Sequence, residues 1–139
     1  MVHIMFLMDE KTPFVEEFIS KLHSRGYDVS LVVDPDVESV KFKESLNNLE
    51  PEDYLICVGE SCKAGLSVLE KKLRSIECAF FIVLSPISFK GSLKAKKVYL
   101  YGDENVNSLA DNLEVEPFVD EELSVLFEEV LIDIISLEH

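Results

Sequence analysis

A short segment in the middle of the chain, Gly59-Glu60-Ser61-Cys62-Lys63, carries residue types that hold small anions. It lies between an apolar run that predicts a strand and an amphipathic pattern that predicts a helix. Ser61 is placed to cap that helix, and the unpaired N–H groups of a first helical turn attract phosphate or carboxylate. Lys63 would add positive charge. The pattern therefore predicts an anion site, with plain helix capping as the alternative interpretation.

Cys62 is a candidate reactive thiol. The positive end of the predicted helix and the neighbouring Lys63 both lower the pKa of a thiol and favour the thiolate. A nucleophilic enzyme also needs a base beside the nucleophile. His3 is predicted in the first strand and His23 at the far end of the first helix, so neither is expected near Cys62. This argues against acid–base catalysis and a histidine-ligated zinc, and it leaves a small packed side chain as the alternative for Cys62.

Acidic residues follow two of the predicted strands. Asp9, Glu10 and Glu60 form a candidate Mg²⁺ site, because hard cations prefer carboxylate oxygens. Solvated acids on loops are the alternative. In open parallel sheets, ligands bind beyond the carboxyl ends of the strands. The ligand-binding candidates at that edge are Thr12, Gly59, Ser61, Cys62, Lys63 and Ser85.

Three known phosphate-handling patterns do not fit the chain. The Gly-x4-Gly-Lys-Ser/Thr order of a Walker loop is missing, and residues 9–13 contain no glycine, which argues against a dinucleotide fingerprint. The two acids after the first strand and Ser85 after the fourth resemble the layout of phosphoacceptor receiver domains. The chain lacks the two residues that carry out the chemistry in receiver domains. No aspartate ends the third strand, where Cys57-Val58-Gly59 stands, and no lysine ends the fifth strand, where Tyr101-Gly102 stands. Aspartyl phosphorylation is therefore not expected.

The elements that must position these residues alternate between apolar runs and helical patterns. Residues 2–8 are apolar on both faces, which is typical of a central parallel strand. Thr12 as N-cap and Pro13 as first residue predict a helix that ends at Gly26. The other predicted strands are 29–33, 54–58, 79–84 and 98–101. The other predicted helices are 37–48 with Val37, Val40 and Leu46 inward, one after Gly59 with Leu66, Leu69, Leu73 and Ile76 on one face, a short one at 105–113, and a last helix from Asp120.

These elements predict one α/β domain over residues 1–136, built in three layers around a mostly parallel five-stranded sheet. The expected strand order is the flavodoxin-like 2-1-3-4-5, with a Rossmann-like arrangement as the related alternative. Residues 115–119 are a candidate extra edge strand. Only 12 residues lead from Pro86 to the fifth strand, which leaves room for one or two helical turns. Residues 137–139 are interpreted as a purification-tag remnant.

The last predicted helix is apolar over more than half of its circumference. A core stripe along it is widened by Val125, Ile132 and Ile135. A helix of this kind is buried on two sides, so we expect a homodimer formed through the C-terminal helix. The alternative is that the helix fills a gap left by the short fourth connection. The core stripe consists of Leu123, Leu126, Phe127, Val130, Leu131 and Ile134.

The formal net charge of −14 is unevenly distributed. Residues 1–58 carry −7, residues 59–102 carry +5 and residues 103–139 carry −12. Nucleic acid is not an expected partner, because binding it needs cationic surface, although the middle segment can form a local positive patch. No stretch reaches the roughly 18 apolar residues of a membrane span, and no secretory signal pattern is present. Three cysteines fit a reducing compartment, so we expect a cytoplasmic protein without membrane attachment.

Three features of the first 60 residues occur together: Met8-Asp9-Glu10-Lys11-Thr12-Pro13 after the first strand, a helix ending Lys21-Leu22-His23-Ser24-Arg25-Gly26, and a strand ending Asp34-Pro35. This layout resembles small uncharacterised Rossmann-like proteins of archaea, particularly methanogens. The resemblance is compatible with a dimer and brings no activity or functional residue with it.

The sequence favours a small binding or regulatory module that holds a small anionic ligand at the carboxyl ends of its strands. Two alternatives stay open. The first is a protein–protein adaptor or subunit that acts through its apolar C-terminal helix. The second is an enzyme that uses Cys62 or the acidic cluster. The cofactor, if any, is not specified by the sequence.

Overall fold

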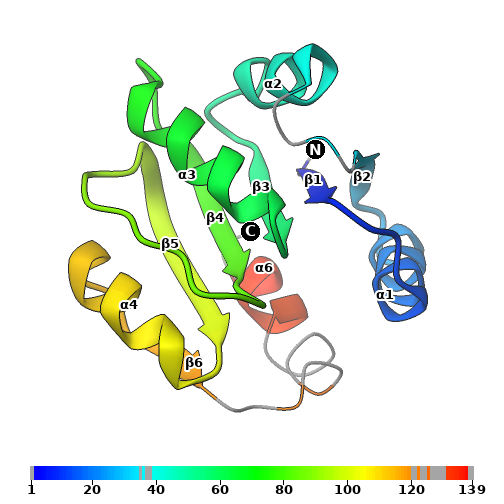
Figure 1. Cartoon of the computed structure of the whole chain (residues 1–139). Helices are drawn as coiled ribbons and strands as arrows, with labels where there is room; N and C mark the ends of the chain where they lie inside the picture. Colours follow the sequence, from blue (N-terminus) through cyan, green and yellow to red (C-terminus); the bar gives the residue numbers. More distant parts are fainter. Residues whose placement is uncertain are drawn as a thin grey trace.

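The computed structural model describes residues 2–34, 36, 39–119, 122, 125 and 131–137. Its centre is one sheet of six parallel strands in the order β2-β1-β3-β4-β5-β6 (Figure 1). The strands are β1 (His3–Met8), β2 (Asp28–Val33), β3 (Tyr54–Val58), β4 (Ile76–Ile82), β5 (Ala95–Gly102) and β6 (Pro117–Val119). The helices are α1 (Pro13–Ser24), α2 (Val40–Asn47), α3 (Ser61–Lys71), the short 3₁₀ helix η1 (Glu104–Val106), α4 (Asn107–Leu113) and α6 (Ile132–Leu137).

The sheet confirms the predicted α/β class and the order 2-1-3-4-5 of the first five strands, but it has six strands rather than five. The additional strand lies inside the candidate edge segment, where β6 pairs with β5 from Leu100–Pro117 to Gly102–Val119. This layout is consistent with a Rossmann-like or flavodoxin-like arrangement. Because all six strands run the same way, the loops that follow their carboxyl ends lie at one edge of the sheet.

Hydrophobic clusters on both faces of the sheet give the domain its three layers. Helices α2, α3 and α4 cover one face, and α1 and α6 cover the other (Figure 1). Neighbouring residues of β1 show the split, because Phe6 joins the cluster beneath α1 and Leu7 joins the cluster beneath α2 and α3. All five residues of β3 are buried, as expected for a central strand that is covered on both faces.

Helix α3 is shorter than the sequence predicts. It ends at Lys71, so Leu73 is 99% exposed instead of lying on the inner face of the helix. The predicted inner stripe fails at Ile76 because this residue begins β4 and pairs with Ala95 of β5. The fourth and fifth strands therefore begin three residues earlier than the apolar runs alone indicate.

Helix α2 also begins later than predicted. Ser39 is its N-cap, and the Ser39 hydroxyl accepts a hydrogen bond from the Phe42 N–H at 3.2 Å. Phe42 and Leu46 are fully buried, whereas Val40 is 71% exposed rather than inward. Val37, which was also predicted to face inward, lies outside the described residues.

The connection between β4 and β5 is a loop without a helix. Its apolar side chains Ile87, Phe89 and Leu93 pack against the cluster beneath α3 and α4. Two hydrogen bonds hold the loop there: the Asn112 side chain donates to the Phe89 carbonyl at 2.9 Å, and the Lys94 N–H donates to the Leu69 carbonyl at 2.8 Å. Loop side chains thus replace the helix that normally covers this part of a parallel sheet.

The C-terminal segment is described only in part. Leu131, Ile132 and Ile135 are buried on the α1 face of the sheet, and Val125 is 41% exposed. The predicted N-cap Asp120 and most of the predicted stripe lie outside the described residues, so the expected homodimer stays a prediction. Among the described residues, no helix has both the length and the apolar content needed to cross a bilayer. The undescribed stripe residues are Leu123, Leu126, Phe127 and Val130.

Candidate functional site

The carboxyl edge of the sheet has its topological switch point between β1 and β3. The chain leaves β1 toward β2 on one side, while β3 pairs with the other side of β1. Open α/β sheets bind ligands where neighbouring connections diverge in this way. The loop that follows β1, residues 9–12, and the turn that follows β3, residues 59–60, flank this point. The structure therefore brings together the two segments that the sequence selected.

Gly59 is the point where these two segments touch. Its φ of +70° lies in the left-handed region that favours glycine. A Cβ atom added at Gly59 would lie 2.6 Å from Oδ1 of Asp9, so the Asp9 carboxylate rests directly against the Gly59 backbone. The Gly59 N–H donates to the Ile82 carbonyl at 3.0 Å. Gly59 is thus explained by the tight turn and by the close approach of Asp9.

The Glu60 side chain contacts two of the predicted ligand-binding residues, Lys63 and Ser85. Its carboxylate accepts a hydrogen bond from the Ser85 hydroxyl at 2.9 Å and pairs with the Lys63 ammonium at 2.8 Å. The bonds from Lys63 and Ser85, in that order of importance, lower the pKa of the Glu60 carboxyl below its ordinary value. Lys63 and Ser85 are therefore close together, as predicted, but both contact a carboxylate of the chain itself.

Ser61 ties the start of α3 to the sheet. Its hydroxyl oxygen is 2.7 Å from the Leu7 carbonyl oxygen and 2.9 Å from the Val58 carbonyl oxygen, the two acceptors for its one proton, and it accepts from the Val58 N–H at 3.0 Å. Ser61 is fully buried, and the N-cap position of α3 belongs to Glu60. The predicted helix-capping role of Ser61 is replaced by a role in anchoring the helix to β1 and β3.

We expect Ser61→Ala to lower the free energy of unfolding by about 1 kcal/mol, because it removes a buried hydroxyl that hydrogen-bonds to the β1 and β3 backbone at Leu7 and Val58. Urea unfolding followed by circular dichroism measures this loss. The matched control is Ser92→Ala, which changes an exposed serine and should stay within about 0.5 kcal/mol of the parent. Equal effects of the two substitutions would contradict the anchoring role.

Cys62 is not the activated thiol that its sequence position predicts. The side chain is fully buried, and its Sγ lies 3.4 Å from both the Cys57 and the Ile82 carbonyl oxygens. Burial raises the pKa of the Cys62 thiol far above its ordinary value, and the carboxylates of Asp9 and Glu60 contribute in the same direction. The helix terminus and Lys63 do not overcome desolvation, so Cys62 is a packed, protonated thiol.

The acidic candidates do not gather into a metal site. In the part of the chain that the structure describes, no three His, Cys, Asp or Glu side chains are grouped closely enough to hold a metal ion. Glu10 is exposed, while Asp9 and Glu60 lie near Gly59. The buried Oγ1 atom of Thr12 has no hydrogen-bond partner among the described residues, although Thr12 is the N-cap of α1.

A cationic groove lies between α2 and α3, and we call it the lysine groove. Lys63, Ser67 and Lys71 form one stripe along α3 at spacings of four residues, and Lys43 and Asn47 of α2 face that stripe. The groove has a volume of about 380 Å³. Among the described residues that line it, three are lysines and none is acidic. The lining consists of Lys43, Asn47, Lys63, Ala64, Ser67, Val68 and Lys71.

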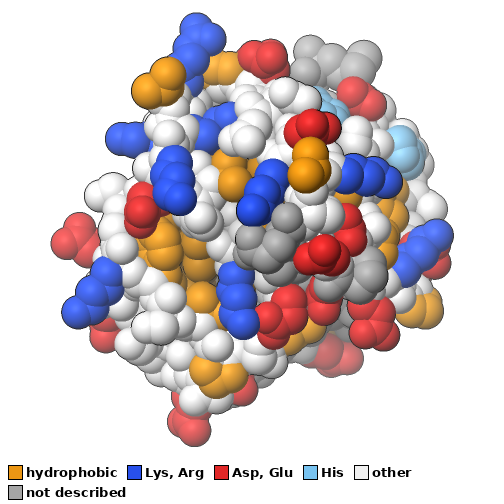
Figure 2. Space-filling model, turned by 45° about the horizontal axis from the view of Figure 1, so that its top comes forward, with side chains coloured by type: hydrophobic (Ala, Val, Ile, Leu, Met, Phe, Trp, Pro, Cys, Tyr) orange, Lys and Arg blue, Asp and Glu red, His pale blue; other side chains and the backbone are white. Residues whose placement is uncertain are grey.

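The surroundings of the lysine groove distinguish it from other hollows. Two neighbouring hollows of about 350 and 540 Å³ share Lys71, but each includes a glutamate, Glu70 or Glu50. On the face shown in Figure 2, Lys and Arg side chains predominate at the upper left, toward the end of α3, and acidic side chains gather at the lower right. The local positive patch expected from residues 59–102 is therefore present on α3 and joined by Lys43 of α2. Of the predicted ligand residues, only Lys63 lines it.

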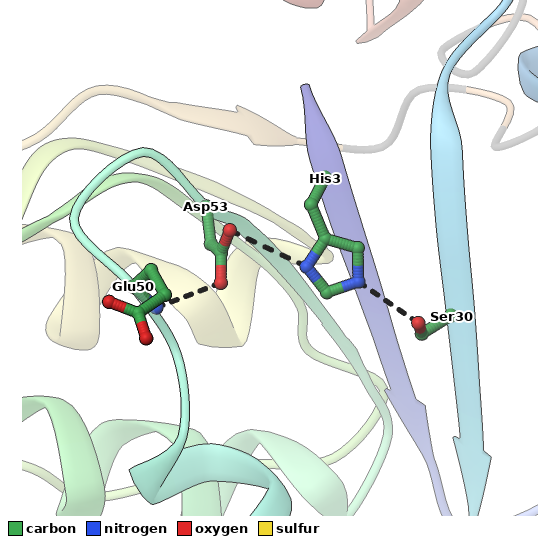
Figure 3. Close-up of polar contacts among 4 residues, drawn as sticks. All are labelled: His3, Ser30, Glu50 and Asp53. Atoms are coloured by element: carbon green, nitrogen blue, oxygen red, sulfur yellow. Dashed lines mark hydrogen bonds and ion pairs between the residues drawn. The ribbon is translucent and has the colours of Figure 1, made fainter. Parts of the chain in front are cut away.

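A polar network at the opposite edge of the sheet was missed by the sequence analysis (Figure 3). His3 at the start of β1 lies between Ser30 of β2 and Asp53, which precedes β3. The His3 Nε2 is 2.9 Å from the Ser30 Oγ, and the His3 Nδ1 is 3.4 Å from the Asp53 Oδ1. Ligand sites of open parallel sheets are expected at the carboxyl edge, whereas His3 and Asp53 lie at the amino edge. The predicted strand order 2-1-3 could have indicated this network, because it places His3 of the first strand between Ser30 of the second strand and Asp53 just before the third.

No protein-family model, no curated protein and no solved structure matches this chain.

Proposed function

We propose that this protein is a small binding module that holds an anionic ligand, such as a phosphorylated metabolite, in the lysine groove. The observation that carries the proposal is the local charge: three lysines and no acidic side chain line one groove of a chain whose net charge is −14. On such a chain, a surface of opposite sign concentrates anions locally.

The two helices supply a fixed frame for the ligand. Lys63 and Lys71 are two turns apart on α3, and Lys43 belongs to α2, so lysine residues line the groove on both sides. Ser67 and Asn47 add neutral hydrogen-bonding groups between the charges. Lysine ammonium groups act as compact point charges, which suits a phosphate with several oxygens. Because the groove is open to water, binding is expected to weaken as salt is added.

Two carboxylates at the carboxyl edge of the sheet, those of Asp9 and Glu60, are expected to repel an anion from the switch point. Asp9 and Glu60 lie beside Gly59. The Glu60 carboxylate already pairs with Lys63, which lines the groove, and accepts a hydrogen bond from Ser85. A second anion at Gly59 would face two carboxylates. The anion site predicted at this turn is thus better placed along α3, with Lys63 shared between the two positions.

The test uses pyrophosphate as the probe. Millimolar pyrophosphate at low salt should raise the melting temperature of the parent protein, because a ligand that binds only the folded state stabilises it by mass action. In NMR titrations, amide shifts should concentrate on α2 and α3. The double variant Lys43→Gln/Lys71→Gln should bind about tenfold more weakly, since two exposed charge interactions together contribute about 1.4 kcal/mol.

The matched control is Lys21→Gln/Lys96→Gln, which changes the net charge equally but affects α1 and β5. It should bind pyrophosphate like the parent. A parent protein that is not stabilised by pyrophosphate, by nucleotides or by sugar phosphates would overturn the proposal. Equal weakening in both double variants would show that only the overall charge matters and would overturn the assignment to the groove.

A further inference from the structure

The geometry points to a second site at the amino edge of the sheet, in which Ser30, His3 and Asp53 act as nucleophile, base and orienting acid for acyl transfer from small activated esters. This inference is independent of the lysine groove. It rests on three side chains from three adjacent segments that meet in the order needed for such a site (Figure 3). The same combination of roles occurs on unrelated folds, so it is recognised by geometry rather than by sequence order.

The sheet itself brings the three residues together. β1 lies between β2 and β3, and Ser30 pairs with Met5, two residues from His3. Met5 and Val32 both pack against the cluster beneath α2 and α3. His3 and Ser30 are each two residues from one of them, so their side chains project from that same face of the sheet. Asp53 reaches His3 from the turn that enters β3.

Asp53 is held in place and selects the tautomer of His3. The residue is 5% exposed, and its Oδ2 accepts a hydrogen bond from the Glu50 N–H at 2.8 Å. An ionised carboxylate can only accept hydrogen bonds, so the Oδ1 atom facing His3 favours a proton on Nδ1. Nε2 is then left as an acceptor and faces the Ser30 hydroxyl at 2.9 Å. This is the tautomer that a general base for Ser30 requires.

The site lies partly at the surface of the protein. The side chain of His3 is 26% exposed, that of Asp53 is 7% exposed, and Ser30 is partly buried. The acid is therefore shielded, while about a quarter of the His3 side chain is exposed. The distance of 3.4 Å between His3 and Asp53 is longer than a short hydrogen bond, and such contacts tighten when a substrate or transition state is bound.

The reaction is balanced without a cofactor. The Ser30 Oγ attacks the ester carbonyl carbon while His3 Nε2 accepts the hydroxyl proton. The tetrahedral intermediate then expels the alcohol oxygen, which takes that proton from His3, and leaves an acylated Ser30. Water, deprotonated in turn by His3, releases the carboxylic acid and regenerates the hydroxyl. Asp53 stabilises the transient imidazolium.

The experiment labels the purified protein with phenylmethylsulfonyl fluoride, in which the Ser30 Oγ would displace fluoride and form a sulfonate ester. Mass spectrometry of peptides should find the label on Ser30, and p-nitrophenyl acetate should be hydrolysed faster than in buffer. Ser30→Ala should abolish both signals. His3→Gln and Asp53→Asn should each reduce the labelling rate at least tenfold, because general base catalysis contributes about 10²–10⁴-fold.

Matched controls separate chemistry from folding. Ser92→Ala and His23→Gln change an exposed serine and an exposed histidine elsewhere and should leave labelling unchanged. If Asp53→Asn does not fold, as judged by circular dichroism, His3→Gln decides alone. The inference is overturned if the parent protein carries no label on Ser30, or if Ser30 is labelled equally fast in folded His3→Gln.

Discussion

Phe80→Ala is expected to lower the free energy of unfolding by about 3–5 kcal/mol, a large share of the total stability of a single domain. Phe80 is 1% exposed in the middle of β4. Its ring stacks on Tyr99 of β5 with centroids 5.8 Å apart and on Phe118 of β6 with centroids 6.2 Å apart. The substitution removes a core side chain and both ring contacts at once.

The loss should be greatest at the edge of the sheet. β6 has three residues and, in the described part of the chain, pairs with β5 alone, and its Phe118 ring stacks on Phe80. Urea unfolding measures the global effect, and hydrogen exchange of β6 amides measures the local one. Phe118→Ala, at a partly exposed position, should cost about 1–2 kcal/mol. A similar cost for both variants would contradict the central role of Phe80.

The fold was predictable where one physical signal dominated. The apolar run at residues 2–8 predicted a central strand, and β1 indeed lies between β2 and β3 with both faces covered. Pro13 and Gly26 likewise bracket α1 as predicted. The end of α3 was not predictable from periodicity. Leu73 continues the helical stripe, but its neighbours carry no glycine or proline stop signal, and only pairing of β4 with β5 decides where the helix ends.

The candidate sites show a different limit. The sequence assigned Glu60 to a metal site and Lys63 and Ser85 to an anion site at the same edge of the sheet. In the structure, Lys63 and Ser85 both contact the Glu60 carboxylate, because parallel strands bring their carboxyl ends together. The sequence could not show that Cys62 points into the core, because burial is set by how α3 rotates onto the sheet. Lys43 and Lys71 belong to different helices, so their meeting in one groove required the tertiary structure. The Lys63–Ser67–Lys71 stripe alone was visible in the sequence.

Gly65→Ala is expected to lower the free energy of unfolding by about 2 kcal/mol, although alanine is the better helix former. Its Cβ would lie 2.6 Å from the Cys57 Sγ and 3.1 Å from the Phe81 Cε1, both of which are in the core. Overpacking of this kind costs about 1–3 kcal/mol or more, and the gain in helix propensity offsets only about 1 kcal/mol. Gly65 is thus required for the close approach of α3 to β3 and β4, not for ligand binding.

A double-mutant cycle tests this explanation directly. Cys57→Ala alone should cost about 1 kcal/mol, because it leaves a small cavity beneath α3. In Cys57→Ala/Gly65→Ala, the new methyl group enters that cavity, so the double variant should be more stable than Gly65→Ala and the coupling should be about 1–2 kcal/mol. Gly26→Ala is the control, because its φ is +88° but nothing lies within 4 Å of an added Cβ. The cost of Gly26→Ala should add to that of Cys57→Ala without coupling. If the costs of Gly65→Ala and Cys57→Ala were also additive, the Cys57 sulfur would not set the distance between α3 and the sheet.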